Sequence, residues 1–204
     1  MRVLRCGLDA VLVELAGLDQ VLGLRAALRT TCPDGVAELV PAARTLLIRY
    51  DPRRLDLGRI RALLAELPAA EAIQECPGEL VVPVRYDGAD LAEVAALTGL
   101  TRREVTDRHL GSRFTVAFCG FAPGFAYLTG LDPALWVPRR TNPRTLVPAG
   151  SVAVADEYTG VYPRPSPGGW QLIGSTELAV WNLARDPVTL LPPGTTVRFE
   201  EVGG

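Results

Sequence analysis

Residues 114–182 constrain the fold more than any other stretch, because proline and glycine interrupt them every few positions. Proline in a helix interior removes a hydrogen-bond donor and clashes with the preceding turn, whereas glycine adopts backbone angles that other residues resist. Valine, leucine and aromatic residues recur between these breakers and need a core in which to be buried. The stretch therefore predicts a compact, mainly β domain with long ordered loops.

The first 77 residues predict a small α+β domain. Asp19 offers an N-cap for a helix that ends before Cys32, and Asp56 offers one for a second helix whose apolar residues recur at helical spacing. Strands are expected near Ile73 and at 3–6, 10–15, 36–40 and 45–50. This order is typical of a two-layer, ferredoxin-like βαββαβ fold.

A turn at Cys76-Pro77-Gly78 predicts the domain boundary, so the second domain is expected to span residues 78–204. It begins with a β run at 80–86 and continues into a helical hairpin at 90–110. The mainly β stretch after the hairpin predicts a β-barrel as the body of this domain.

The helical hairpin has clear local signals. Asp90 begins its first helix and Gly99 ends it, while Thr101 and Glu104 have the spacing of a capping box at the start of the second helix. Residues 95–105 also resemble a DNA-binding helix-turn-helix. Acidic residues in the second helix and the slightly acidic chain disfavour that alternative.

The charge balance excludes polyanionic partners. All 21 basic residues are arginine and are nearly balanced by 23 acidic residues, for a net charge of -2. Such a chain lacks the basic field that nucleic acid or an anionic membrane requires. The four cysteines form no CxxC motif, no signal peptide follows Met1, and no apolar run approaches the roughly 20 residues that cross a bilayer. We expect a cytoplasmic protein with reduced thiols.

Missing residue types restrict the chemistry. Without lysine the chain has no P-loop lysine and forms no Schiff base. His109 is the sole histidine, so a multi-histidine zinc centre is excluded and no metal site is expected. A GxSxG elbow is also absent. A hydrolase that works alone is therefore poorly supported.

Two residues have both a catalytic and a structural interpretation. His109, near the end of the second hairpin helix, is a candidate acid or base. Its alternative role is to stabilise helix carbonyls or to pack between the hairpin and the barrel. Cys119 is a candidate nucleophile, but its position after a β run favours a small apolar residue of a sheet.

Three loops carry candidate binding residues. Arginine pairs carboxylate or phosphate through two parallel donors, and nearby prolines restrict the loop of Arg139, Arg140 and Arg144, although solvated surface arginines are the alternative. The aromatic residues of the other loops line a pocket or belong to the core. We predict His109 and Arg144 as catalytic, and as substrate-binding Phe121, Pro123, Gly124, Phe125, Arg139, Arg140, Gly168, Gly169, Trp170 and Gln171.

The amino-acid sequences of these loops resemble the motifs of a known family. The segment from Cys119 to Leu128 resembles the GFxPGFxYL motif of the family that contains the B subunit of 5-oxoprolinase, also called the kinase A inhibitor or allophanate hydrolase subunit 1 family. His109 and the segment from Tyr86 to Leu91 match upstream. Later signatures follow in order at 138–140, 143–144, 147–152, 159–163 and 166–174.

The resemblance implies an architecture and a function. Members of the family have a small α+β domain followed by a cyclophilin-like β-barrel of the carboxyltransferase subdomain C and D type. In bacterial 5-oxoprolinases, the B subunit works with a homologous C subunit, together with an A subunit, in the ATP-dependent opening of 5-oxoproline to glutamate. The resemblance implies that the complex uses ATP and that this chain alone binds no cofactor.

Other functions are compatible with the same signatures. One branch of the family inhibits a sporulation histidine kinase, so a kinase-binding regulator is the alternative. A peptidyl-prolyl isomerase rests on barrel analogy alone, which is weak evidence for function. For the enzyme reading, we expect the three loops to lie together with His109 beside them, and an apolar, aromatic-containing surface to be covered by the C subunit.

Overall fold

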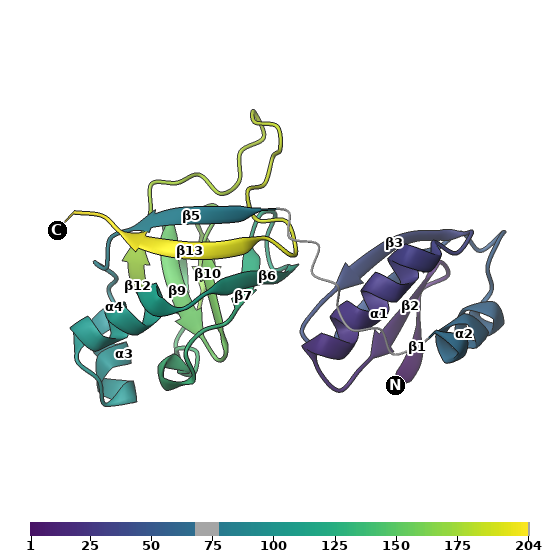
Figure 1. Ribbon diagram of the computed structural model, residues 1–204, viewed down its shortest axis with the longest axis horizontal. Coiled ribbons are helices and arrows are strands. Elements are labelled where there is room, and N and C mark those ends of the chain that lie inside the picture. The colour runs from purple at the N-terminus through teal and green to yellow at the C-terminus, as the bar shows by residue number, and fades with distance from the viewer. Residues whose placement is uncertain (68–77, 204) are drawn as a thin grey trace. The chain divides into compact units, whose positions relative to one another are not determined.

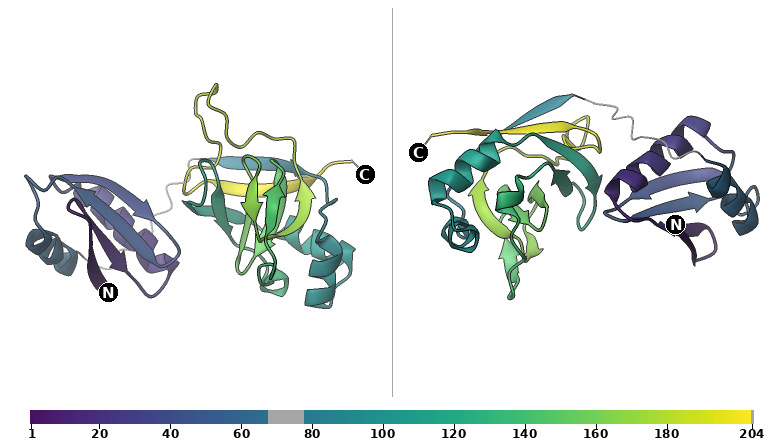
Figure 2. Two further views of the ribbon diagram at one scale, coloured as in Figure 1. Left: turned by 180° about the vertical axis from the view of Figure 1, so that it is seen from behind. Right: turned by 60° about the horizontal axis from the view of Figure 1, so that its bottom comes forward.

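In the computed structural model, residues 1–67 and 78–203 are described, and the chain divides into two compact units, Met1–Glu75 and Cys76–Gly204 (Figure 1). Each unit has its own hydrophobic core. The two further views show that the strands of each unit form their own sheet (Figure 2). The predicted order of an α+β unit followed by a mainly β unit is therefore confirmed.

The first unit is a four-stranded antiparallel sheet with two helices. Its strand order is β1-β2-β4-β3, and hairpins join β1 to β2 and β3 to β4. The elements are β1 (Arg2–Cys6), β2 (Ala10–Glu14), α1 (Leu18–Thr31), β3 (Val36–Pro41), β4 (Thr45–Tyr50) and α2 (Leu57–Glu66). The sheet and both helices share one core, formed by Val11, Val13, Val21, Leu28, Leu46, Ile48, Tyr50, Leu55, Ile60 and Leu64.

The strands and helices of the first unit lie where they were predicted, but their order is not strictly the βαββαβ of a ferredoxin-like fold. The described elements follow the order ββαββα, and β1 holds the sheet edge beside β2. The closing strand expected near Ile73 and most of the expected boundary turn lie outside the described residues.

The helix ends of the first unit follow local chemistry. The Asp56 carboxylate caps α2 by accepting a hydrogen bond from the Arg59 amide at 2.8 Å, as predicted. For α1 the predicted cap is wrong, because the N-cap is Gly17 and Asp19 lies within the first turn. In that position the carboxylate faces the positive end of the helix dipole.

The second unit is built around a nearly closed seven-stranded sheet of order β12-β9-β10-β7-β6-β13-β5, in which only β13 and β5 are parallel. Its strands are β5 (Glu79–Val84), β6 (Phe114–Cys119), β7 (Ala126–Thr129), β9 (Ser151–Ala155), β10 (Tyr158–Val161), β12 (Gln171–Ser175) and β13 (Thr196–Glu201). A small second sheet pairs β8 (Arg144–Val147) with β11 (Ser166–Gly168).

The seam of this barrel lies between the chain after β5 and strand β12. Arg85 and Ser175 exchange two backbone hydrogen bonds of 2.8 Å, and the Asp90 amide donates to the Leu172 carbonyl at 2.9 Å. Backbones approach so closely here that a side chain at Gly88 would collide with the main chain of Ile173. Glycine is therefore required for closure at this point.

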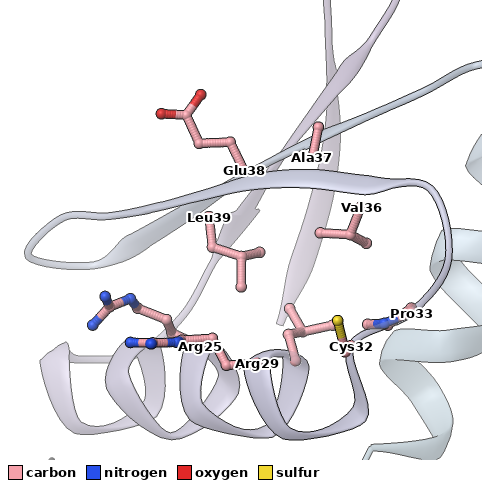
Figure 3. Close-up of a pocket in the computed structure, with 9 residues that line it drawn as sticks. Arg25, Arg29, Cys32, Pro33, Val36, Ala37, Glu38 and Leu39 are labelled. Atoms are coloured by element: carbon pink, nitrogen blue, oxygen red, sulfur yellow. The ribbon is translucent and has the colours of Figure 1, made fainter.

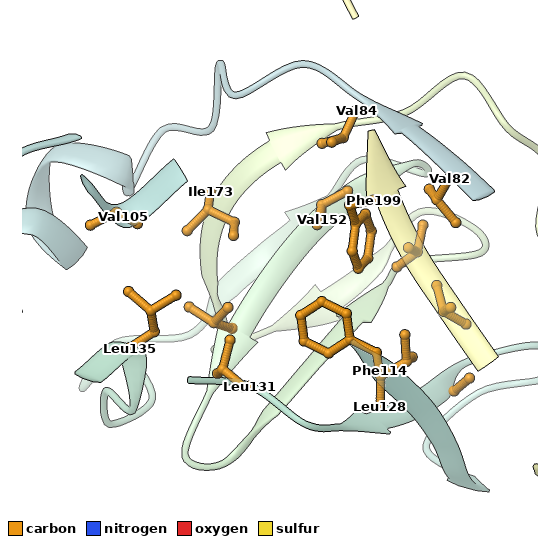
Figure 4. Close-up of a cluster of buried hydrophobic side chains, with 14 of the residues drawn as sticks. Val82, Val84, Val105, Phe114, Leu128, Leu131, Leu135, Val152, Ile173 and Phe199 are labelled. Atoms are coloured by element: carbon orange, nitrogen blue, oxygen red, sulfur yellow. The ribbon is translucent and has the colours of Figure 1, made fainter. Parts of the chain in front are cut away.

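Two helices cover one end of the barrel core. These are α3 (Leu91–Thr98) and α4 (Arg102–Gly111), and a short 3-10 helix, η1 (Pro133–Leu135), packs near both. The capping box of Thr101 and Glu104 and the left-handed C-cap at Gly99 are both confirmed. The core itself includes Val105 of α4 with Phe114, Leu128, Ile173 and Phe199 of the barrel (Figure 4).

None of the described helices combines the length and apolar character that a bilayer crossing requires.

Candidate functional site

The structure brings the three predicted loops together. The Arg140 amide donates to the Gly169 carbonyl at 2.7 Å, and the Gln171 side-chain amide donates to the Pro138 carbonyl at 3.3 Å. Trp170 then contacts Phe125 edge to face, with ring centroids 5.3 Å apart. Residues 121–125, 138–144 and 168–171 therefore form one continuous region of the barrel unit, which we call the three-loop region.

Aromatic rings form the apolar part of this region. Phe125 is at the centre, and its ring makes edge-to-face contacts with four neighbours at centroid distances of 5.1–5.4 Å: Phe121, Tyr127, Tyr162 and Trp170. Phe125, Tyr162 and Trp170 are buried, whereas Phe121 is 60% exposed. Three of these rings therefore serve as core, and Phe121 presents an apolar face to solvent.

The loop of the GFxPGF motif is held in a specific conformation. Gly120 and Phe125 close it with a backbone hydrogen bond of 3.1 Å. Gly124 has a positive φ of 82°, and a Cβ there would lie 2.6 Å from the Cβ of Trp181. Phe121 also has a positive φ, 65°, which is uncommon for a bulky residue and indicates local strain. Pro123 is exposed at the tip.

A buried carboxylate organises the polar part of the region. Asp90, only 2% exposed, accepts two hydrogen bonds from Arg144, at 2.8 Å and 2.6 Å. It also accepts one from Arg140 and one from the Leu172 amide, each at 2.7 Å. Burial by itself raises the pKa of Asp90, but the hydrogen bonds from Arg144 and Leu172 and the two nearby arginine charges lower its pKa overall. The carboxylate is therefore ionised and fully hydrogen-bonded.

This network contradicts the alternative that Arg144 is a solvated surface arginine. Arg144 begins strand β8, its side chain is only 24% exposed, and both of its terminal nitrogens bond Asp90. Arg139, by contrast, has a side chain that is 57% exposed, with its nearest carboxylate, Asp156, at 3.6 Å. Of the three predicted arginines, Arg139 is the one whose charge faces solvent.

Two buried polar atoms in the three-loop region have no hydrogen-bond partner among the described residues. One is the Nε of Arg140, a donor, and the other is the Oε1 of Gln171, an acceptor. Gln171 pairs with Val154 of β9, a core residue, so its side chain lies on the inner face of the sheet. A donor and an acceptor with unused bonding capacity therefore lie at the contact between residues 138–140 and 169–172.

His109 lies inside the barrel. Its ring is fully buried against the rings of Phe114 and Phe199, with centroid distances of 5.1 Å and 4.5 Å. Its Nδ1 is 2.8 Å from the Tyr86 hydroxyl and its Nε2 is 3.0 Å from the Thr159 hydroxyl. Burial lowers the pKa of His109 to about 3, so the ring is neutral at physiological pH.

The tautomer of His109 follows from these contacts. The Thr159 hydroxyl donates its one proton to the Ala153 carbonyl at 3.0 Å, so it accepts from the Nε2–H of His109. The Nδ1 then accepts from the Tyr86 hydroxyl. Both ring nitrogens are satisfied, which favours the packing role over acid-base use.

Strand β10 separates His109 from the aromatic part of the three-loop region. Thr159 faces the core with His109, whereas Gly160, the next residue, packs against the rings of Phe125 and Trp170. Successive residues of a strand point to opposite faces, so His109 and the aromatic cluster lie on opposite faces of the sheet. His109 therefore does not lie beside the aromatic cluster, contrary to expectation, although it shares the inner face of the sheet with Gln171.

Two pockets lie elsewhere. One, of about 360 Å³, is in the first unit between α1 and β3, where Val36 and Leu39 point towards the helix and Glu38 points away (Figure 3). The other, of about 280 Å³, is beside the barrel seam and includes Arg85 and Ser175. Neither contains a predicted site residue. Across residues 1–67 and 78–203, no three histidine, cysteine or acidic side chains are grouped as a metal site.

Comparison with known proteins identifies the family. A model of the carboxyltransferase domain, subdomain C and D, matches residues 1–191. The chain belongs to this family. It is 43% identical over 179 residues to a protein of Escherichia coli O157:H7 named as the B subunit of 5-oxoprolinase, covering 86% of this chain and 82% of that protein. It is 38% identical to the Bacillus subtilis protein of the same name, with coverages of 82% and 76%.

A solved structure shows the same fold in a longer chain. The crystal structure of TTHA0988 matches with a TM-score of 0.80 and 41% identity. The match covers 96% of this chain but only 40% of that one. The carboxyltransferase fold of this chain therefore also occurs joined to a further large segment of protein.

Sequence reasoning missed two residues that organise this carboxyltransferase domain. Asp90 was expected as a helix start within the matching segment from Tyr86 to Leu91, yet its side chain makes no cap bond and accepts hydrogen bonds from two arginines instead. The many arginines of the chain made an ion pair with Asp90 plausible, but no residue close to Asp90 in the sequence identifies which arginines it would bind. Tyr162 lies within the signature at 159–163, and a side chain at Gly168 would collide with its hydroxyl.

Proposed function

We propose that this chain is a non-autonomous subunit of a heteromeric, ATP-dependent amidohydrolase that opens 5-oxoproline to glutamate. The observation that carries the proposal is the 43% identity to a protein named as the B subunit of 5-oxoprolinase, over 86% of this chain and 82% of that protein. We propose as its partners a homologous C subunit, together with an A subunit.

The polar atoms of the three-loop region support a lactam substrate. The ring amide of 5-oxoproline presents an N–H donor and a C=O acceptor on the same edge, and its carboxylate carries one negative charge. Arg140 Nε matches the carbonyl, Gln171 Oε1 matches the N–H, and the exposed Arg139 charge matches the carboxylate. Because the first two atoms are buried, this contact requires a local opening of the loops.

The contacts of His109 and Arg144 favour positioning roles for both. Each is already satisfied by protein groups, His109 by Tyr86 and Thr159 and Arg144 by Asp90. Their predicted catalytic roles stay hypotheses. In this proposal, Arg144 and Asp90 hold Arg140 in place, and His109 stabilises the barrel beneath the three-loop region.

ATP belongs to the complex in this proposal. The chain has no lysine for a P-loop, so we assign nucleotide binding to another polypeptide of the complex.

We also assign the barrel to the cyclophilin-like type and the first unit to a ferredoxin-like variant, in which β1 takes the sheet edge beside β2. A cytoplasmic location is proposed with them, and the structure has the thiols of Cys6 and Cys32 free.

Reconstitution tests this function. This chain and the homologues of the A and C subunits are purified separately, and glutamate formation from 5-oxoproline is measured with ATP. Turnover is expected only when all three are present. Equal turnover without this chain would remove the assignment, and inhibition of a sensor kinase's autophosphorylation by this chain alone, without any effect on turnover, would support the regulator instead.

A further inference from the structure

A hairpin-like loop projects from the barrel between β12 and β13 (Figure 1). Trp181 and Thr189 form an isolated antiparallel bridge in this loop, and the Asn182 amide donates to the Val188 carbonyl at 2.9 Å. Leu183, the residue after Asn182, is 80% exposed. Of the large apolar side chains in the described residues, none is more exposed than Leu183.

One arginine holds this projecting hairpin together. The Arg185 guanidinium donates to the carbonyls of Ala179, Pro187, Val188 and Val180 at 2.9, 3.1, 3.3 and 3.4 Å. The base is anchored in the barrel core by Val180 and Leu191, both buried. The Arg185 guanidinium therefore orders the backbone of this loop, which carries the exposed Leu183.

The hairpin also packs against the loop that carries Phe121. Trp181 contacts Gly124, where only glycine leaves room for the indole. Phe121 is 60% exposed and is held by edge-to-face contacts with Phe125 and Tyr162. Two ordered loops that touch each other thus each expose one large apolar side chain. We call these two loops, residues 121–125 and 179–189, the apolar clasp.

Single exposed apolar side chains are common on protein surfaces and need no explanation. The apolar clasp differs because the backbone of both loops is held by hydrogen bonds, the Phe121 ring is held by two neighbouring rings, and Phe121 has a strained backbone angle. A pre-ordered apolar side chain loses little entropy when it binds, which is typical of interface anchors. These observations favour an interface over an accidental exposure.

We propose that the apolar clasp is the surface through which this barrel binds a separate partner protein, with Leu183 inserted into an apolar pocket of that partner. The occupant is the polypeptide that corresponds to the rest of the longer TTHA0988 chain, of which this fold makes up only 40%. Two relatives of this chain are named as subunits, and the proposal therefore takes the partner to be a separate protein. The inference rests on the proposed function in taking that partner to be the C subunit.

The chemistry of the contact follows from the clasp. Four of the five N–H groups of Arg185 donate to carbonyls of its own loop, and the exposed side chains of the clasp are leucine and phenylalanine, so the proposed contact is apolar rather than ionic. Salt weakens contacts between exposed charges but not apolar burial. Raising NaCl from about 0.1 M to about 1 M is therefore expected to leave the affinity for the C subunit almost unchanged.

The test measures the Kd between the purified full-length chain and the homologue of the C subunit by calorimetry. Leu183→Arg is expected to weaken binding by more than about tenfold, and Leu183→Ala by less, because only the arginine leaves a charge in an apolar pocket. Leu97→Arg, on α3 at 53% exposure, and Leu8→Arg, in the first unit at 76%, are the controls and should bind normally. Thermal melting should be unchanged in all four variants.

Several results would overturn the inference. These are an unchanged Kd for Leu183→Arg, an equal loss in the two control variants, or a Leu183-dependent self-association without affinity for the C subunit. The proposed function fails separately. A complex that depends on Leu183 but does not open 5-oxoproline would reject the proposed function and support the docking surface. Normal turnover with Leu183→Arg would support the proposed function and reject the docking surface.

Discussion

The Arg144 guanidinium forms two hydrogen bonds to the Asp90 carboxylate, although 54 positions separate the two residues in the chain. The same carboxylate binds Arg140 and the Leu172 amide. One buried anion therefore joins the start of α3, the loop before β8 and strand β12. Changes to this network, to the buried histidine and to the unused polar atoms should each have a distinct effect.

Asp90→Asn should destabilise the barrel unit strongly. The variant leaves two partly buried guanidinium groups without their shared anion, a change that costs about 3–5 kcal/mol when a buried ion pair loses one partner. Urea unfolding measures the loss. Glu93→Gln is the matched control, because Glu93 is exposed and also contacts Arg140, at 3.3 Å, and it should change stability by less than about 1 kcal/mol. Similar stability for both variants would contradict the organising role of Asp90.

Arg144→Lys should destabilise the protein about as much as Arg144→Ala does. Lysine keeps the charge but cannot supply two parallel donors to one carboxylate. We expect both variants to lower the unfolding free energy by about 1–3 kcal/mol, because bonds to a buried charged acceptor are lost. Arg139→Ala, on the exposed neighbour, should stay within about 0.5 kcal/mol of the parent. If Arg144→Lys kept the full stability of the parent, a positive charge at position 144 would be enough to stabilise Asp90, without two parallel donors.

His109 should make stability fall in mild acid. Its pKa is lowered to about 3 in the folded protein, against an ordinary value of 6.5, so below pH 6.5 only the unfolded chain takes up the proton. The contribution of neutral His109 to the unfolding free energy is fully present above pH 6.5. It is lost as the pH falls towards 3, by about 1.4 kcal/mol per pH unit.

Because His109 is the chain's only histidine, the variant His109→Gln tests this assignment directly. Urea unfolding at pH 7.5 and pH 5 should show a loss of about 2 kcal/mol in the parent and little change in the variant. The lowered pKa of Asp90 acts in the same direction but only below its ordinary value of 3.8, outside this window. An equal loss in the parent and the variant would assign the acid sensitivity to other groups.

Gln171→Met should separate folding from turnover. The variant removes a buried acceptor that has no partner among the described residues, together with a single 3.3 Å bond to Pro138, so the stability change should be small. If Oε1 accepts the substrate N–H, kcat/KM for 5-oxoproline in the reconstituted complex should fall by at least about tenfold. Gln20→Met, in α1 of the first unit, is the matched control. Unchanged kcat/KM would remove Gln171 from the site.

Local patterns were enough to predict most of the elements. The Asp56 cap and the capping box of Thr101 and Glu104 depend on side chains within a few positions of the backbone groups they satisfy. The Gly99 end of α3 depends on a left-handed backbone that glycine adopts readily. The turn residues of the three loops were also readable, because proline and glycine restrict backbone angles locally. Where local signals competed, as between Gly17 and Asp19 at the start of α1, the prediction was wrong by two positions.

The sequence by itself determined the order of the units, the family signatures and the absence of lysine and of a second histidine. Only the tertiary structure decided what the charged and polar side chains contact. Arg144 looked free because its partner Asp90 is far away along the chain, and His109 looked close to the loops because sequence distance does not show which face of β10 a residue meets. Sheet pairing sets these contacts, and it joins residues whose spacing in the sequence carries no local signal.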